Sequence, residues 1–126
     1  MVETGSTVYR QKEYQTLLLE FDDDVAILQL NRPRANNALN SQMLDELIEV
    51  LRQIACDGEI KALIICGAGK SFSAGGDVES FSTFGSTEAR EFVDRVFHLE
   101  QLLVDLPQPT IAAISGFALG GGMEIA

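Results

Sequence analysis

Short apolar runs separated by turn residues predict several strands. Residues 16–21 and 25–30 are apolar runs on either side of an aspartate triplet, residues 22–24, and this arrangement predicts a hairpin. The uninterrupted apolar run at residues 62–67 predicts a strand that is covered on both faces. A second such run at residues 110–115 predicts another buried strand.

Two longer stretches have helical spacing instead. Residues 41–55 carry apolar side chains at steps of three and four, and Asn40 or Ser41 can cap the first turn. Residues 87–106 repeat this pattern until Pro107 prevents the helix from continuing. A last helix is expected to begin near Gly121 or Gly122. The loops are expected at residues 31–40 and 67–86.

Alternation of strands and helices predicts an α/β fold. We expect residues 1–14 to form a mobile tail and residues 15–126 to form the core. The last expected helix has only its first turn, which predicts a fragment of a larger domain. The apolar stretch at 110–126 contains glycines and Glu124 and is short for a bilayer, so a strand and a helix start are expected there rather than a membrane span.

Charge and composition narrow the classes of function. The 126 residues carry a net charge of −10, which disfavours general binding of nucleic acid or anionic membranes. Two cysteines, Cys56 and Cys66, and one histidine, His98, offer neither a disulfide scaffold nor a zinc site, so no metal is expected. The N-terminus has no apolar core typical of a signal peptide, and we expect a cytoplasmic or organelle-matrix protein.

Two glycine clusters, Gly75–Gly76 and Gly120–Gly122, each follow an apolar run. Glycine permits close approach of a ligand to the backbone, and amides that are free at strand ends or helix starts can donate to it. Two donors from separate loops would form an oxyanion hole for a carbonyl oxygen. The alternative is that the glycines only form turns. Neither cluster has the spacing of a phosphate-binding loop.

Three segments together resemble the crotonase, or enoyl-CoA hydratase/isomerase, superfamily. They are the Asn-Arg-Pro loop at residues 30–40, the glycine loop at 69–78 and the run at 109–124 that ends in Gly-Gly-Gly-Met-Glu. The resemblance implies a repeated ββα spiral that is incomplete here, because the C-terminal helical region of the family lies beyond residue 126. It also implies a homo-oligomer, a trimer or dimer of trimers, for the complete protein.

The resemblance also implies roles for individual residues. The amides of Gly76 and Gly121 would hold the thioester oxygen, and Glu124 would be one of two acid/base carboxylates. The second carboxylate of hydratases lies beyond this chain, so the chain alone is expected to lack part of the active site. The residues that the resemblance assigns to acyl-CoA binding are Arg32, Arg34, Ala35, Ala74, Gly76, Asp77, Val78 and Gly121.

The expected activity is that of a lyase of fatty acid β-oxidation, the reversible addition of water to a 2-enoyl-CoA, with coenzyme A entering as part of the substrate and no separate cofactor. Asn36 and Glu79 depart from the family pattern, and Glu79 weakens one expected contact with the nucleotide. Three alternatives stay open: a Δ3-Δ2 enoyl-CoA isomerase, an acyl-CoA hydrolase or decarboxylase, and a truncated, non-catalytic paralogue that binds acyl-CoA or an oligomer partner.

Overall fold

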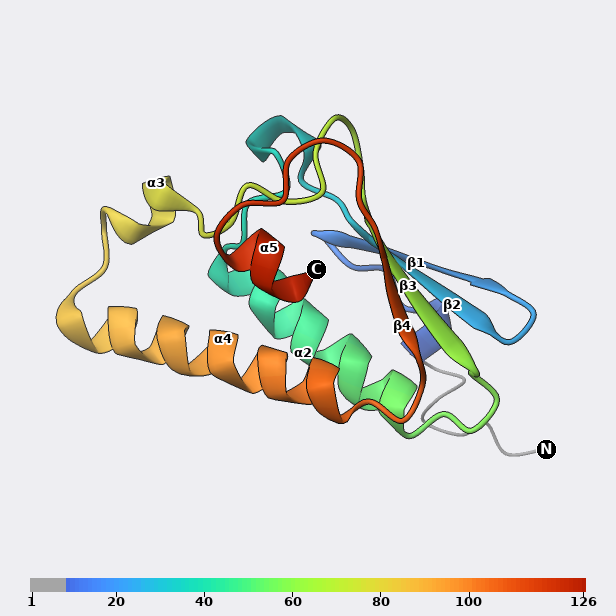
Figure 1. The fold of residues 1–126 in the computed structure, drawn as a ribbon. Coiled ribbons are helices and arrows are strands. Elements are labelled where there is room, and N and C mark those ends of the chain that lie inside the picture. Colours follow the sequence, from blue (N-terminus) through green and yellow to red (C-terminus); the bar gives the residue numbers. More distant parts are fainter. Residues whose placement is uncertain (1–8) are drawn as a thin grey trace.

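A four-stranded sheet forms one layer of the computed structural model, which describes residues 9–126 (Figure 1). The strands β1 (Leu17–Asp22), β2 (Val25–Leu30), β3 (Ala62–Gly67) and β4 (Thr110–Ala113) are neighbours in chain order. The first two form the predicted antiparallel hairpin, and its turn places Asp23 at a φ of 52°. The pairs β2–β3 and β3–β4 are parallel.

The two long helices connect the parallel strands. Helix α2 (Ser41–Ala55) runs from β2 to β3 and has the predicted bounds, with the Asn40 side chain accepting from the Met43 amide at 2.9 Å. Helix α4 (Ser86–Asp105) runs from β3 to β4. Parallel neighbours require such crossovers. The sequence analysis therefore predicted both helices correctly.

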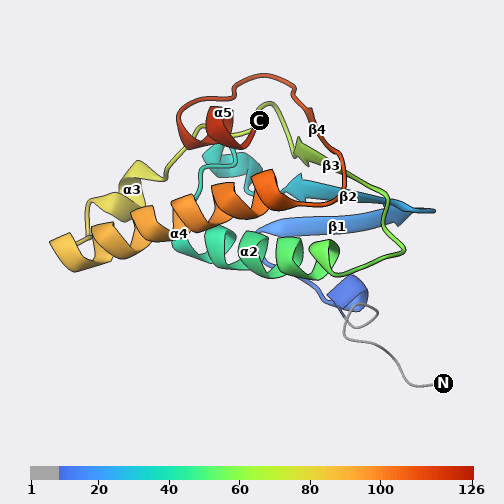
Figure 2. The ribbon, with the colours of Figure 1, turned by 60° about the horizontal axis from the view of Figure 1, so that its bottom comes forward.

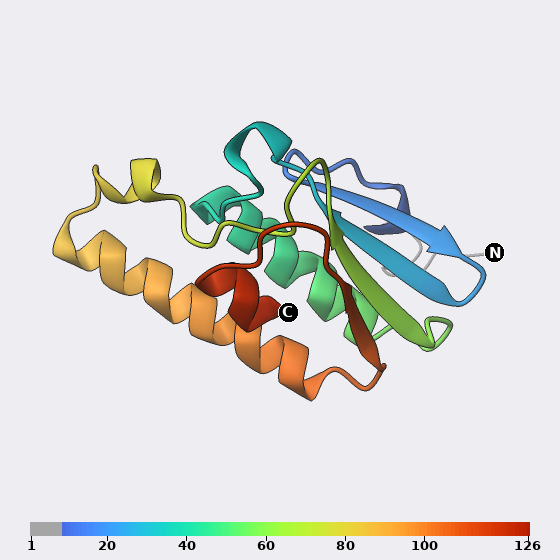
Figure 3. The ribbon, with the colours of Figure 1, turned by 45° about the horizontal axis from the view of Figure 1, so that its top comes forward.

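Three short helical segments follow β2 in the described residues. The segment η1 (Pro33–Ala35) lies in the first predicted loop, and α3 (Val78–Phe81) lies in the second, where no helix was predicted. Because α3 has only four residues, apolar periodicity gives it no signal. Helix α5 (Gly121–Ile125) begins at the predicted glycine and lies next to α4 (Figure 3).

The core lies between the sheet and the two long helices, which occupy one face of the sheet side by side (Figure 2). Alternate residues of the strands point into it, while α2 contributes one complete apolar stripe. The fully buried large side chains are Phe72, Leu17, Leu28, Leu30, Leu39, Met43, Leu44, Leu47, Leu51, Ile54, Leu63 and Ile65.

Burial of β3 and β4 corrects two expectations. In β3, Leu63 and Ile65 are buried but Ile64 and Cys66 are only half-buried, so the strand is not covered on both faces. In β4, which was expected to be buried, Ile111 is 56% exposed. The physical reason is that α2 and α4 lie on a single face and that β4 is the edge strand of the described sheet.

Part of the predicted N-terminal tail is buried in the core. Of the predicted tail, residues 1–8 lie outside the described residues, but Tyr9 is 3% exposed and its hydroxyl donates to Asp57 at 3.1 Å. Arg10 also donates to this carboxylate through Nε at 3.0 Å. These bonds attach residues 9 and 10 to the end of α2. Among residues 9–126, none of the helices has the length and apolarity that crossing a membrane requires.

Candidate active site

Three loops meet at one edge of the sheet, the edge where the parallel strands β2, β3 and β4 have their carboxyl ends. They are residues 31–40, which we call the Asn-Arg-Pro loop, residues 68–77, the first glycine loop, and residues 114–120, the second glycine loop. Open α/β sheets bind ligands at this edge. The loops contain all the candidate residues except Val78, Gly121 and Glu124. Val78 is the first residue of α3, and Gly121 and Glu124 lie in α5.

Backbone hydrogen bonds join the Asn-Arg-Pro loop to the first glycine loop. The Leu39 amide donates to Gly75 O at 2.7 Å, and the Asp77 amide donates to Leu39 O at 2.9 Å. The Ala74 amide donates to Asn36 O at 2.9 Å. These bonds use the amides on both sides of Gly75–Gly76, so this part of the loop has a defined position.

The two glycine loops are joined in the same way. The Ser73 amide donates to Phe117 O at 3.0 Å, and the Leu119 amide donates to Ser73 O at 3.0 Å. Gly122 packs directly on Ser73, because a Cβ at position 122 would stand 2.5 Å from Ser73 O. Here glycine is required for the close approach of two backbones, a role that the sequence analysis did not predict.

The amides of Gly76 and Gly121 donate no hydrogen bond within residues 9–126. Gly121 is the first residue of α5, where an amide has no partner inside the helix. The two glycine segments touch, since a Cβ built on Gly75 would stand 3.3 Å from Gly121 N. The fold therefore places the unused amide of Gly121 beside the segment that contains the unused amide of Gly76.

Asn37 and Ser73 support this arrangement, and sequence reasoning did not single out either. Asn37 is fully buried, and its Nδ2 donates to Ala68 O at 2.9 Å and to Ser71 O at 2.8 Å. The Ser73 hydroxyl donates to Asn37 O at 2.8 Å and accepts from the Gly75 amide at 3.2 Å. The available signal was the Asn36–Asn37 pair, since asparagine tolerates the positive φ found at both positions.

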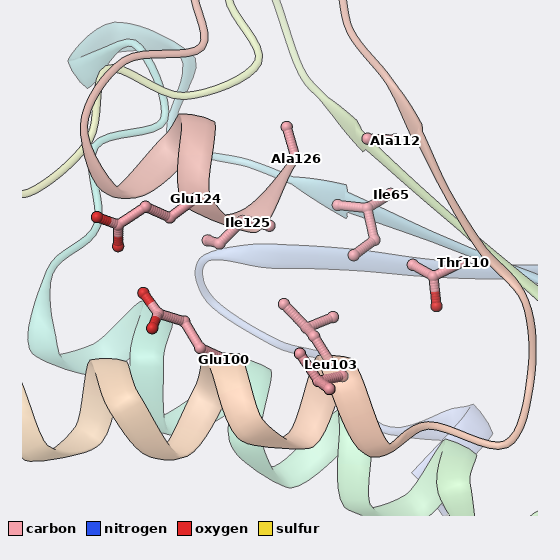
Figure 4. A pocket seen from close by; sticks show the side chains of 9 residues that line it. Ile65, Glu100, Leu103, Thr110, Ala112, Glu124, Ile125 and Ala126 are labelled. Atoms are coloured by element: carbon pink, nitrogen blue, oxygen red, sulfur yellow. The ribbon is translucent and has the colours of Figure 1, made fainter.

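Glu124 lies on α5 and lines a cavity of about 440 Å³ (Figure 4). Its side chain faces Glu100 of α4 across this cavity. The neighbouring carboxyl group of Glu124, together with burial, raises the pKa of Glu100. Sequence reasoning missed Glu100, because its position on a helical face gives no indication of what the next helix places opposite it.

Arg32 and Asp77, both expected to bind acyl-CoA, contact each other. Arg32 Nη2 lies 3.0 Å from Asp77 Oδ2, and Asp77 also accepts from the Glu79 amide at 3.2 Å. Burial would raise the pKa of Asp77, but the bonds from Arg32 and from the α3 amides outweigh it, and the pKa lies below its usual value. In this structure the pair joins the Asn-Arg-Pro loop to the start of α3.

The other candidate residues for acyl-CoA binding differ in exposure. Arg34 is exposed and lies with Ala35 along a groove of about 450 Å³ on the Asn-Arg-Pro loop. Val78 is 76% exposed, whereas Ala74 is half-buried. In the part of the chain that the structure describes, no three His, Cys, Asp or Glu side chains gather as around a metal ion.

Comparison with known proteins identifies the family. The model of the enoyl-CoA hydratase/isomerase family matches residues 20–126. The short-chain-enoyl-CoA hydratase of Clostridium acetobutylicum is 44% identical over 118 residues, and the crotonyl-CoA hydratase of Syntrophomonas wolfei is 40% identical over 114 residues. Each match covers 90% of this chain but only 44% of the relative.

Solved structures agree with the family match. An enoyl-CoA hydratase from Bacillus anthracis superposes with a TM-score of 0.85 at 34% identity, covering 88% of this chain and 44% of the other. An enoyl-CoA hydratase/carnithine racemase from Magnetospirillum magneticum gives a TM-score of 0.87 at 34% identity, covering 94% and 45%. The chain thus spans less than half of these proteins and confirms the predicted crotonase-like fold. It belongs to the enoyl-CoA hydratase/isomerase family.

Proposed function

We propose that the full-length protein is an enoyl-CoA hydratase, which adds water reversibly to a 2-enoyl-CoA thioester. The observation that carries this proposal is that Gly75–Gly76 and Gly121 lie on touching segments and that the amides of Gly76 and Gly121 donate no hydrogen bond within residues 9–126. Glu124 lies about one helical turn after Gly121 in α5. The 40–44% identity to curated hydratases supports the same reaction.

The proposed chemistry follows from the electronic structure of an enoyl thioester. Hydrogen bonds from the two amides to the carbonyl oxygen draw electrons from the β-carbon and stabilise the enolate. The Glu124 carboxylate accepts a proton from water while the water oxygen bonds to the β-carbon. The electron pair of the double bond moves toward the carbonyl. The α-carbon then takes a proton from the second acid/base carboxyl group that the resemblance to hydratases implies, which gives the 3-hydroxyacyl-CoA, and the proton that Glu124 took from water restores that acid.

Coenzyme A enters as part of the substrate and needs a cationic contact for its phosphates. Arg34 suits this role, since it is exposed beside a groove and forms no salt bridge within residues 9–126. Arg32 is already paired with Asp77, so we assign it to fixing the loop that the nucleotide contacts. Ala35, Ala74 and Val78 complete the proposed acyl-CoA surface.

The proposal includes a homo-oligomer in a reducing compartment such as the cytoplasm. The free thiols of Cys56 and Cys66 agree with this setting, because oxidising compartments favour disulfides. Exposed apolar side chains near the second glycine loop, such as Phe117 at 57% and Leu119 at 54%, agree with further covering contacts. The intact mass and the sedimentation of the native protein test the proposed homo-oligomer.

A Δ3-Δ2 enoyl-CoA isomerase is the second candidate, because the matching family model covers both activities. Both reactions use a stabilised enolate, so the oxyanion hole alone does not distinguish them. Incubation of the full-length protein with crotonyl-CoA and with a 3-enoyl-CoA does. Formation of the 3-hydroxyacyl-CoA from the first supports the hydratase, whereas conversion of only the second supports the isomerase.

Glu124→Gln tests the proposed acid/base role. The substitution keeps size and hydrogen bonding but cannot accept a proton from water, so hydration is expected to fall by about 10²–10⁴-fold. Binding of butyryl-CoA, measured by calorimetry, is expected to persist. Glu91→Gln is the matched control, since that side chain is exposed on α4. Unchanged turnover of crotonyl-CoA by Glu124→Gln would refute the assignment.

A further inference from the structure

The cavity beside Glu124 contains a second carboxylate that the proposed mechanism does not use. Its walls come from α4, α5 and the strands β3 and β4 (Figure 4). Glu100 projects into it from α4, and Glu124 projects toward Glu100 from α5. The remaining lining side chains are uncharged, and they are Ile65, Leu103, Val104, Thr110, Ala112, Ile125 and Ala126.

No cationic side chain lines this cavity within residues 9–126. The nearby basic groups of α4 are directed toward α2. Arg95 lies 2.8 Å from Asp45 Oδ1, and His98 Nε2 lies 2.9 Å from a guanidinium nitrogen of Arg52. From β3 and β4, the lining contributes Ile65, Ala112 and the hydroxyl of Thr110, none of which carries charge. Within the described part of the chain, the two carboxyl groups therefore face each other without a counter-charge.

Two carboxylates in one site do not ionise independently, because the second negative charge forms next to the first. The pair holds one proton over a pH range that extends above the titration of a lone glutamate. In that range the protonated member donates a hydrogen bond to the ionised one. The raised pKa of Glu100 places the retained proton on α4.

We propose that Glu100 is a positioning residue of the active site, whose carboxyl group faces that of Glu124 across the cavity and orients it toward the substrate. This inference rests on the proposed function, in which Glu124 takes the proton of the attacking water. It adds a carboxylate from α4 to a site otherwise built from the glycine loops and α5. Glu100 itself needs no contact with the substrate.

A bound acyl group is expected to strengthen the retention of the proton by the two carboxyl groups. It would cover the cavity and exclude water, and desolvation disfavours a second negative charge. The proton shared by the pair is then retained to higher pH in the enzyme–substrate complex than in the free protein. Since kcat reports ionisations of the complex and kcat/KM those of the free enzyme, the two profiles are expected to differ on their alkaline side.

The pH dependence of crotonyl-CoA hydration by the full-length protein tests the inference. In the wild type, kcat is expected to fall about tenfold to a lower plateau as Glu100 loses its proton. Glu100→Gln keeps an amide donor that does not titrate, so this fall is expected to disappear. Glu100→Ala removes the donor and is expected to lower kcat about tenfold at all pH values, with KM nearly unchanged. If Glu100 had a purely structural role, Glu100→Gln would not selectively remove the alkaline fall in kcat.

A direct titration separates this inference from the proposed function. Carbon-13 NMR of labelled glutamate carboxyls follows Glu100 in the wild type and in Glu124→Gln without any turnover. We expect the pKa of Glu100 to drop toward its ordinary value when position 124 loses its charge. Absence of hydration with this coupled titration would reject the hydratase but keep the pair. Independent titration of the two glutamates, or identical kcat profiles of wild type and Glu100→Gln, would overturn the inference.

Discussion

The ring of Phe81 lies against Gly76 so closely that a Cβ at position 76 would stand 2.5 Å from Phe81 Cζ. Phe81 is the last residue of α3, and its ring also contacts Phe92 of α4 with a centroid distance of 4.8 Å. The proposed amide donor of the first glycine loop is thus backed by an aromatic cluster. The absence of a side chain at Gly76 is a packing requirement as well as a means of access to the amide.

Gly76→Ala is expected to destabilise the full-length protein by about 1–3 kcal/mol, since overpacking of this size costs that much. The φ of Gly76 is not in the left-handed region, so backbone strain does not contribute. In a Phe81→Ala background the same change is expected to cost less than about 0.5 kcal/mol. Urea unfolding of the wild type, the two single variants and the double variant measures the coupling free energy between positions 76 and 81. Equal costs in both backgrounds would contradict the contact.

Gly121→Pro tests the second proposed donor. Proline removes the amide hydrogen but suits the first position of a helix, which Gly121 occupies in α5. Loss of one oxyanion donor is expected to reduce kcat for hydration by about 10²–10³-fold. Gly121→Ala is the control, because it adds the same Cβ, 3.1 Å from Leu39 Cδ1, and keeps the N–H. The role is refuted when the folded proline variant turns over as fast as the alanine variant.

The spacing of apolar residues predicted those elements whose form and burial are specified by neighbouring residues in the sequence. Helix α2 was found at its predicted bounds because its apolar stripe and Asn40 cap are both local signals. The four-residue α3 was missed because a helix this short has no periodicity. Exposure of Ile111 was missed because an apolar strand does not indicate whether a neighbour covers it.

Prediction of the site was likewise limited to features that neighbouring residues in the sequence specify. The glycine clusters were visible in the sequence, and the fold joins them through Ser73. The pairing of Arg32 with Asp77, 45 positions apart, depends on the folded loops and gave no local signal. The opposition of Glu100 and Glu124 likewise results from how α4 and α5 pack. Chemistry that depends on long-range contacts therefore had to come from the structure.

Asp77→Asn is expected to lower the stability of the full-length protein in a pH-dependent manner. The pKa of Asp77 is lower in the folded protein than in the unfolded chain, so its stabilising contribution is present above the unfolded value, about 4. It is lost as pH falls through the folded pKa. Above pH 5 we expect the wild type to exceed Asp77→Asn by about 1 kcal/mol, and we expect this difference to vanish in acid.

Urea unfolding at a series of pH values measures this difference. Asp94→Asn is the control, since Asp94 is exposed on α4 and its side chain forms no hydrogen bond within residues 9–126. Arg32→Gln is expected to reduce the pH dependence as Asp77→Asn does, because either change breaks the same ion pair. A stability difference between wild type and Asp77→Asn that stays constant down to the lowest pH would contradict the depressed pKa.

Asn37→Ala is expected to destabilise the full-length protein by about 3 kcal/mol. The change leaves Ala68 O and Ser71 O without their side-chain donor in a buried place, and each such loss costs about 1–3 kcal/mol. Asn36→Ala is a matched control, because Asn36 has nearly the same positive φ, 52° against 54°, but its side chain is exposed. Backbone strain is therefore equal in the two variants, and their difference in unfolding free energy isolates the buried amide bonds. Equal stabilities would show that Asn37 matters only for its backbone conformation.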